Sequence, residues 1–230
     1  MPDRIPAEHT VIFDLDGTLI DPFEGITQSI RYALHEMGRP APLASELTWC
    51  IGPPLFDSFA TLLGGTSVAS RGDIEEAIRL YRVRFSHVGI YECQLYSGIP
   101  ETLEELANQG FSLLVATSKP HVYALPIVEH LEVGQWFQHV YGAEMDGTRR
   151  DKGALLEHVL AKERIIGDQT IMIGDRRYDV DGAREVGIRS IGVSFGYAAP
   201  GELEAADPDV LVATPREIPA AVMQLLGDAR

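Results

Sequence analysis

The sequence predicts an α/β fold: a parallel sheet with crossover helices and one inserted helical domain. Three observations lead to this fold class. From about Gly98 onward, short apolar runs alternate with helical patterns, as in parallel sheets. Residues 20–95 contain mainly helical patterns and break this alternation. Ahead of them, the apolar run 11–13 has the composition of a buried strand and stops at two aspartates, Asp14 and Asp16.

Three helices are expected in the insertion. One pattern covers residues 23–37, and a second covers 46–63 apart from an interruption at Gly52-Pro53-Pro54. In the third, residues 73–87, apolar residues recur at helical spacing. We therefore expect two domains. The core consists of residues 1–19 and 93–230, and the inserted helical domain consists of residues 20–92.

The alternating part of the chain predicts five further strands after the first. The helix before them has Pro100 in its first turn and Gly110 just past its end, which is the usual asymmetry of helix termini. Each strand is short and apolar on both faces, as expected where helices cover both sides of a sheet. The expected strands are 111–117, 139–143, 170–173, 190–193 and a last one at 209–212; the expected helices are 100–109, 120–131, 153–162, 180–186 and 215–226.

Composition excludes several classes of protein. The chain has 230 residues, 45% of them hydrophobic and 23% charged, as in an ordinary globular enzyme. A net charge of −15 argues against a nucleic-acid polymer as partner, because no basic stripe could release counterions. No apolar run is long enough to cross a membrane, and Met1–Thr10 lacks the apolar core of a signal peptide. Cys50 and Cys93 are expected to be reduced thiols, which indicates a cytoplasmic protein. We also expect a monomer or a homodimer.

The two aspartates after the first strand indicate a metal. A buried strand that ends in two carboxylates requires a compensating positive charge. Mg²⁺ meets that need, because it prefers oxygen ligands and combines one or two carboxylates with substrate phosphate. Gly17 permits the tight turn that would expose both acids. The alternative is a turn that Asp14 and Gly17 merely stabilise.

The segment Asp14-Leu15-Asp16-Gly17-Thr18 resembles the first motif of the haloacid dehalogenase (HAD) superfamily of phosphohydrolases. The resemblance implies a Rossmann-like core sheet with a helical cap domain inserted after the first strand. It also implies a Mg²⁺-dependent phosphatase in which Asp14 is the nucleophile and Asp16 the general acid and base. Mg²⁺ would be held by Asp14, Asp16 and a later aspartate, Asp175.

Other strand ends should lie beside the two aspartates, since ligands bind outside the carboxyl ends of the strands in a doubly wound sheet. Thr117 matches the family's second motif, a hydroxyl that contacts the phosphoryl group; the alternative is a helix cap. Lys152 matches the third motif, an ammonium that neutralises charge; the alternative is a solvated lysine. Lys119 competes with it and is kept as a contact on the substrate side. The expected phosphate-binding residues are Leu15, Asp16, Thr117, Ser118 and Lys152.

Gly174-Asp175 and Asp179 match the fourth motif of the superfamily. Asp175 would ligate Mg²⁺, and Asp179 would orient either a metal-bound water or Lys152. The alternative is that these acids only favour the start of the next helix, which would explain Asp179 and Asp181 but not Asp175.

The substrate is expected to be a small phosphorylated metabolite. Residues 146–152 depart from the Lys-Pro-x-Pro form usual in phosphoglycolate phosphatases and are more similar to a bacterial branch of 5′-nucleotidases. This favours nucleoside 5′-monophosphates; phosphoglycolate, a β-phosphoglucomutase-like reaction and an inert regulatory protein stay open as alternatives. Trp49 could instead pack in the cap, and Arg149 could form a surface ion pair. The residues expected to select the substrate are Trp49, Gly52, Pro53, Lys119 and Arg149.

Overall fold

The structure is a computed structural model that describes residues 9–65 and 67–227. Residues 1–8 and 228–230, which were expected to belong to the core, lie outside the described residues. The same holds for most of the segment 1–10, which was considered as a signal peptide. The chain divides into two compact units, Met1–Asp21 with Leu95–Arg230 and Pro22–Gln94. The division into a catalytic core and a cap stays a proposal.

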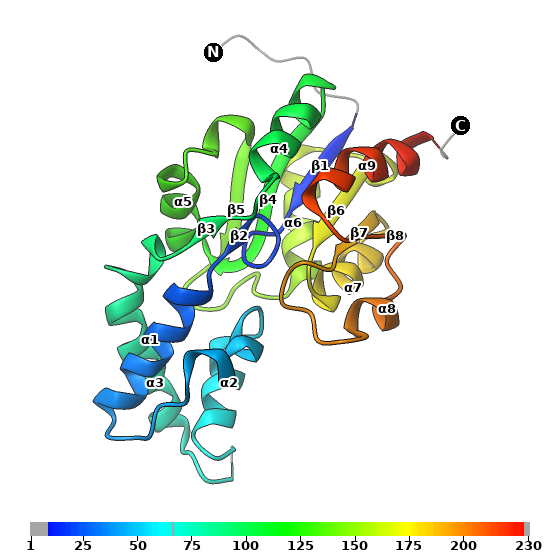
Figure 1. Ribbon diagram of the computed structural model, residues 1–230. Coiled ribbons are helices and arrows are strands. Elements are labelled where there is room, and N and C mark those ends of the chain that lie inside the picture. The colour runs from blue at the N-terminus through cyan, green and yellow to red at the C-terminus, as the bar shows by residue number, and fades with distance from the viewer. Residues whose placement is uncertain (1–8, 66, 228–230) are drawn as a thin grey trace. The chain divides into compact units, whose positions relative to one another are not determined.

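The first unit contains a parallel sheet of six strands in the order β5-β4-β1-β6-β7-β8 (Figure 1). Its register pairs Val11 with Leu113 on one side and with Ile171 on the other, so β1 lies between β4 and β6. The strands are β1 (Thr10–Phe13), β4 (Ser112–Pro120), β5 (His139–Ala143), β6 (Thr170–Gly174), β7 (Arg189–Val193) and β8 (Val210–Val212).

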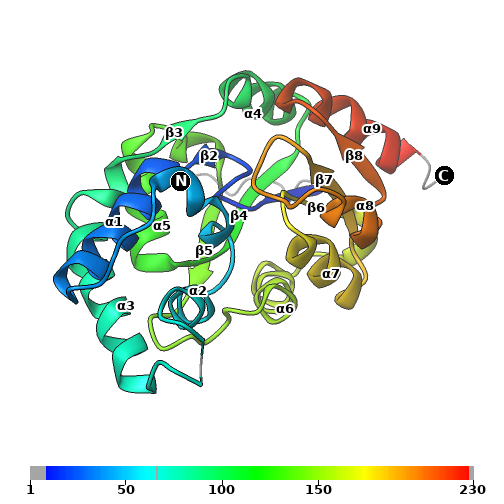
Figure 2. The ribbon, with the colours of Figure 1, turned by 60° about the horizontal axis from the view of Figure 1, so that its bottom comes forward.

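Helices cover both faces of this sheet. Figure 2 shows α6 and α7 on one face and α4 and α9 on the other, while α5 packs against β4 and β5. On the first face, Ile12 and Met172 of the sheet join Leu155 of α6 and Ala183 of α7 in one buried apolar cluster. Burial on both faces is why these strands read as continuous apolar runs. The helices are α4 (Ile99–Asn108), α5 (His121–His130), α6 (Lys152–Glu163), α7 (Arg177–Glu185), α8 (Glu202–Ala206) and α9 (Ile218–Gly227).

The chain leaves and re-enters this unit through a small sheet of two strands, β2 (Ile20–Asp21) and β3 (Gln94–Leu95). The second unit then consists of α1 (Phe23–Glu36), α2 (Leu55–Leu62) and α3 (Arg71–Phe85), with α3 packed against the other two. No helix among the described residues is long and apolar enough to cross a membrane.

One predicted helix is wrong in part. Within 46–63 only Leu55–Leu62 is α-helical; the stretch before it forms two short 3₁₀ turns, Ala44–Glu46 and Thr48–Cys50. The physical reason is the Gly52-Pro53-Pro54 sequence, because a residue before proline is excluded from the α region and glycine lowers helix stability. Gly52 itself has a φ of 101°, which continues no helix.

The remaining predicted elements are present, with ends shifted by up to three residues. Three ends are shifted by three residues. The strand β4 ends at Pro120 and not at 117, α7 begins at Arg177 and not at 180, and α9 begins at Ile218 and not at 215. The early start of α7 is explained by Asp179, because its carboxylate accepts the backbone N–H of Arg176 at 3.1 Å and thereby caps the first turn.

Candidate active site

The acidic residues lie where two neighbouring strands end. Asp14 directly follows β1, and Asp175 directly follows β6, its neighbour in the sheet. Between these strands the connections change direction, since β1 is followed by β4 on one side and β6 by β7 on the other. Such a reversal leaves a crevice at the carboxyl ends of the strands. The sheet topology therefore brings together two acids that are far apart in the sequence.

Lys152 links the acids of this crevice. It is the first residue of α6, only 5% exposed, and its Nζ lies 2.9 Å from Asp14 Oδ1 and 2.8 Å from Asp179 Oδ1. Nζ also donates to the carbonyl oxygen of Ala116 at 2.9 Å. Burial lowers the pKa of Lys152, but attraction from the two carboxylates outweighs it and raises the pKa above its usual value. The lysine is therefore a buried, permanent cation, and not a solvated side chain.

Asp179 combines both roles that were considered for it. Its Oδ2 caps α7, and its Oδ1 faces the Lys152 ammonium. The side chain is buried, and burial raises its pKa to about 6 against the opposing attraction of Lys152. Asp181 instead pairs with Arg177 and Arg184 on the exposed surface of the same helix, as expected of an acid near a helix start.

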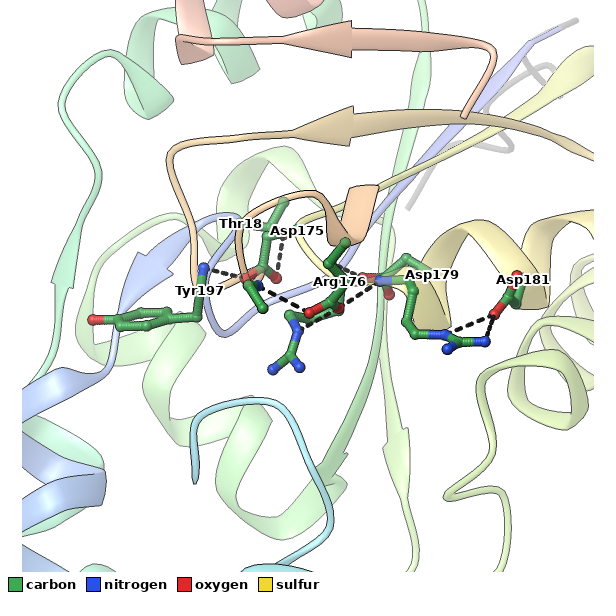
Figure 3. Close-up of polar contacts among 9 residues, drawn as sticks. Thr18, Asp175, Arg176, Asp179, Asp181 and Tyr197 are labelled. Atoms are coloured by element: carbon green, nitrogen blue, oxygen red, sulfur yellow. Dashed lines mark hydrogen bonds and ion pairs between the residues drawn. The ribbon is translucent and has the colours of Figure 1, made fainter. Parts of the chain in front are cut away.

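Asp175 is buried without an ion-pair partner among the described residues. Its Oδ2 accepts the backbone N–H of Tyr197 at 2.7 Å, and the Thr18 hydroxyl lies 3.4 Å from Oδ1 (Figure 3). Burial raises the pKa of Asp175 well above its usual value, and the nearby charges of Asp179 and Asp14 add to this effect. An anionic Asp175 therefore requires a further positive charge.

Two glycines allow Asp175 to sit between two turns. A Cβ on Gly17 would lie 2.1 Å from Asp175 Oδ2, and a Cβ on Gly196 would lie 2.5 Å from the same atom. Gly17 also has a φ of 84°, where a side chain is strained. Backbone from the turn after β1 and from the loop after β7 thus encloses the carboxylate on both sides.

Asp16 pairs with Lys119. The Lys119 Nζ lies 2.8 Å from Asp16 Oδ2, with only 6% of the lysine side chain exposed. The other carboxylate oxygen, Oδ1, is buried and has no hydrogen-bond partner among the described residues. Burial raises the pKa of Asp16, and the Lys119 ammonium acts against this rise. One oxygen is thus paired with a lysine, while the other has no partner among the described residues.

The two hydroxyls at the end of β4 differ. Thr117 is buried, and its Oγ1 accepts the backbone N–H of Lys119 at 3.2 Å, so it does not cap α5. Ser118 donates its hydroxyl to the carbonyl oxygen of Arg150 at 3.0 Å. A phosphate contact from the Ser118 hydroxyl would compete with this bond, whereas the proton of the Thr117 hydroxyl is available for an acceptor.

Comparison with known proteins identifies this arrangement. The family model described as haloacid dehalogenase-like hydrolase matches residues 11–193, from the first strand to the end of β7. This match covers most of the chain. The protein belongs to the haloacid dehalogenase-like hydrolases.

Individual relatives differ in the reaction they are named for. A 5′-nucleotidase from Pseudomonas aeruginosa is 42% identical over 86% of this chain and 88% of its own length. Tyrosine-protein kinase PtkA from Mycobacterium tuberculosis is 40% identical over 81% of this chain but only 62% of its own length. The crystal structure of a predicted phosphatase from Clostridium acetobutylicum superimposes with a TM-score of 0.87, at 36% identity, over 94% of this chain and 98% of that one. This HAD-like protein is therefore an enzyme of the phosphatase type.

The HAD-like site has the composition of a cation site. Carboxylate oxygens of Asp14, Asp175 and Asp179 lie within 4.8 Å of one another, and all three residues are buried. Counting Asp16 as well, four carboxylates face two ammonium groups, those of Lys119 and Lys152. One divalent cation would balance the remaining two negative charges, and an all-oxygen ligand set suits Mg²⁺. The residues present therefore fit the metal that the superfamily uses.

Of the residues expected to select the substrate, Lys119 lies at this site, paired with Asp16, whereas the described contacts do not bring the other four to it. Arg149 forms an ion pair with Glu144 in the loop after β5, which is the surface alternative considered for it. Trp49, Gly52 and Pro53 belong to the helical unit, where Trp49 is 42% exposed and so does not pack in the core of that unit. Their role in this HAD-like enzyme stays a proposal.

Sequence patterns missed two contacts of the HAD-like site. The pairing of Lys119 with Asp16 joins the ends of two strands, and no spacing along the chain shows which acid a lysine will meet. The contact from Tyr197 to Asp175 uses a backbone N–H, which nearly every residue possesses.

Proposed function

We propose that this enzyme is a Mg²⁺-dependent phosphomonoester hydrolase that acts through an aspartyl phosphate at Asp14, with nucleoside 5′-monophosphates as the favoured substrates. The observation that carries the proposal is the contact of Asp14 with a buried lysine, next to Asp16, an acid with one oxygen unpartnered among the described residues. The same strand end thus offers a nucleophile and a proton donor two residues apart.

In the first step, one Asp14 oxygen attacks phosphorus while the ester oxygen leaves. The leaving oxygen takes its proton from Asp16, whose raised pKa suits a proton donor. The Lys152 ammonium stays hydrogen-bonded to the other Asp14 oxygen during the attack. The Thr117 hydroxyl can donate to a phosphoryl oxygen. The products of this step are the free alcohol and a phosphorylated Asp14.

In the second step, a water molecule attacks phosphorus and gives a proton to the Asp16 carboxylate. The acyl phosphate bond breaks, inorganic phosphate leaves, and both aspartates return to their first states. Asp14, the Asp16 carbonyl and Asp175 would hold Mg²⁺, which neutralises the phosphoryl oxygens when it is bound.

Support for a nucleotide substrate comes from two sources. One is the similarity to a protein named 5′-nucleotidase over most of both chains. The other is the segment 146–152, which departs from the pattern of phosphoglycolate phosphatases. Phosphoglycolate is the alternative substrate, and transfer to a second hydroxyl of a sugar phosphate is the alternative reaction.

The test is phosphate release, with and without Mg²⁺, from AMP, GMP, UMP, phosphoglycolate and glucose 1-phosphate. We expect the highest kcat/KM for a nucleotide and no turnover without Mg²⁺. A preference for phosphoglycolate would overturn the nucleotide assignment only, and a requirement for a sugar bisphosphate activator would indicate a mutase. The Asp14→Asn variant should fold normally, as judged by its melting temperature, and lose hydrolysis by many orders of magnitude. Near-normal hydrolysis by this variant would overturn the whole mechanism.

A further inference from the structure

The loop after β7 holds Asp175 by its backbone alone. The Tyr197 N–H donates to Asp175 Oδ2 at 2.7 Å, and Gly196 fits so closely that a Cβ there would lie 2.4 Å from the Asp175 Cβ. Any movement of this loop therefore moves the carboxylate. A backbone N–H could come from any residue but proline, so the contact itself does not explain a tyrosine at this position.

The side chain of Tyr197 reaches a different part of the core. Figure 3 shows its ring extending away from Asp175. The hydroxyl donates to Asp21 Oδ1 at 2.5 Å, and the Tyr96 side chain lies close enough to contribute to the raised pKa of Tyr197. Burial, together with the bond to Asp21, raises the pKa of Tyr197, so the hydroxyl is a neutral donor at ordinary pH.

Asp21 and Tyr96 mark the two places where the chain crosses between the units. Asp21 is the last residue of the core before Pro22, and Tyr96 is the second core residue after the chain returns at Leu95. The two crossings are tied together, since the Tyr96 N–H donates to the carbonyl oxygen of Leu19 at 3.1 Å. The Tyr96 ring also packs edge-on against Phe195, at 5.0 Å between ring centres, in the same loop as Tyr197. The loop is thus anchored on both crossing segments.

We propose that Tyr197 is a positioning residue for the divalent-cation site: its side chain, anchored on Asp21, fixes the loop whose N–H orients the Asp175 carboxylate. The inference rests on the cation site of the proposed function. Its physical basis is that Asp175 lacks an ion pair among the described residues, so the Tyr197 N–H is its one short polar contact. A ligand oriented before the cation arrives loses less freedom on binding.

The test is the Mg²⁺ affinity of the whole protein, measured by titration calorimetry without substrate. Tyr197→Phe removes only the hydroxyl, and we expect the Kd for Mg²⁺ to rise about tenfold, the lower end of the range for residues that orient metal ligands. Asp21→Ala should raise it similarly, and the double variant should be no worse than either single variant, since both act through one bond. At saturating Mg²⁺, kcat should stay close to that of the wild type. The control is Tyr178→Phe, at a tyrosine that is 46% exposed, which should leave the Kd unchanged.

The outcomes are distinct. A Kd within twofold of the wild-type value in a folded Tyr197→Phe protein overturns the role of Tyr197 and leaves the cation site intact. Absence of Mg²⁺ binding by the wild type overturns both proposals. If melting curves show that Tyr197→Phe is unfolded, Asp21→Ala decides by the same twofold criterion. Additive effects in the double variant would also contradict the proposal, because they would mean that the two groups act separately.

Discussion

Two buried lysines divide the carboxylates of the site between them. Lys152 contacts Asp14 and Asp179, and Lys119 contacts Asp16, while Asp175 is left to the expected cation. The role of Lys152 could be expected from its place before the fourth motif. The partner of Lys119 could not be predicted, because the choice of partner depends on which strand ends are neighbours in the sheet.

Removal of the Lys119 ammonium should leave an uncompensated buried carboxylate. For Lys119→Ala we expect the free energy of unfolding to fall by about 3 kcal/mol, as is usual when one partner of a buried pair is removed. Urea denaturation of the metal-free protein measures the change. In Lys119→Ala/Asp16→Asn the loss should be smaller than the sum of the single losses. The control is Lys162→Ala, an exposed lysine over the Tyr141 ring, which should lose less than about 1 kcal/mol. Additivity in the double variant would show that the ion pair does not carry the stability.

Trp49 offers a test of substrate selection at the level of one side chain. An exposed indole in the helical unit could stack on a nucleobase, a contact worth about 1–3 kcal/mol. For Trp49→Ala we therefore expect KM for AMP to rise about tenfold or more, and KM for phosphoglycolate to stay within twofold. Leu43→Ala, an exposed residue of the same unit, should change neither value. Equal rises for both substrates would leave only a packing role for Trp49.

At the scale of elements, strand ends and tight turns deliver the chemistry. β1 and β6 end at the same edge of the sheet, and α6 begins with the lysine that joins them. These elements were predictable, since each combines apolar periodicity with a clear start or stop signal. The structure of the segment 46–63 was not predictable in full. Its apolar spacing suits one helix, but the Gly52-Pro53-Pro54 sequence prevents a helix before Leu55.

The turn after β1 can be tested with a matched pair of glycines. Gly17 and Gly110 both have a positive φ, 84° and 90°, but only Gly17 has a neighbour within reach of a Cβ. Gly110→Ala should lower stability by about 1 kcal/mol through strain and keep full activity. Gly17→Ala should add a collision with the Asp175 carboxylate and abolish both Mg²⁺ binding and hydrolysis. Calorimetry and phosphate release measure these effects. An active Gly17→Ala enzyme would show that Asp175 is not held as the structure has it.

At the scale of the whole molecule, the net charge of −15 is concentrated in part at a site that requires a cation. Such a site should make stability depend on pH and on Mg²⁺ together. The pKa of Asp179 is raised to about 6 in the folded protein, and that of Asp175 is also raised. Between about pH 4, where an unfolded aspartate titrates, and pH 6, the folded protein therefore holds protons that the unfolded chain has lost.

The sign of the expected effect follows from this proton balance. Since the folded state binds more protons, the free energy of unfolding of the metal-free protein should fall as pH rises from about 4 to 6. Mg²⁺ needs the deprotonated acids, so the rise in melting temperature on adding Mg²⁺ should be small near pH 4 and grow toward neutral pH. Melting curves with Mg²⁺ and with EDTA at equal ionic strength measure this difference. A shift that did not change with pH would contradict a site made of these carboxylates.

The sequence by itself determined the α/β class, most of the elements and the HAD superfamily, and it predicted Asp14, Asp16, Lys152 and Asp175 as site residues. These are local properties, since apolar periodicity and motif residues can be read without knowing what lies beside them. Only the tertiary structure decided that Lys119 pairs with Asp16, that Arg149 pairs with Glu144, and that Tyr197 orients Asp175. Each of those contacts joins segments through sheet order or loop packing. The energy of a charge or an N–H depends on the partner that the fold places beside it, and no spacing along the chain specifies that partner.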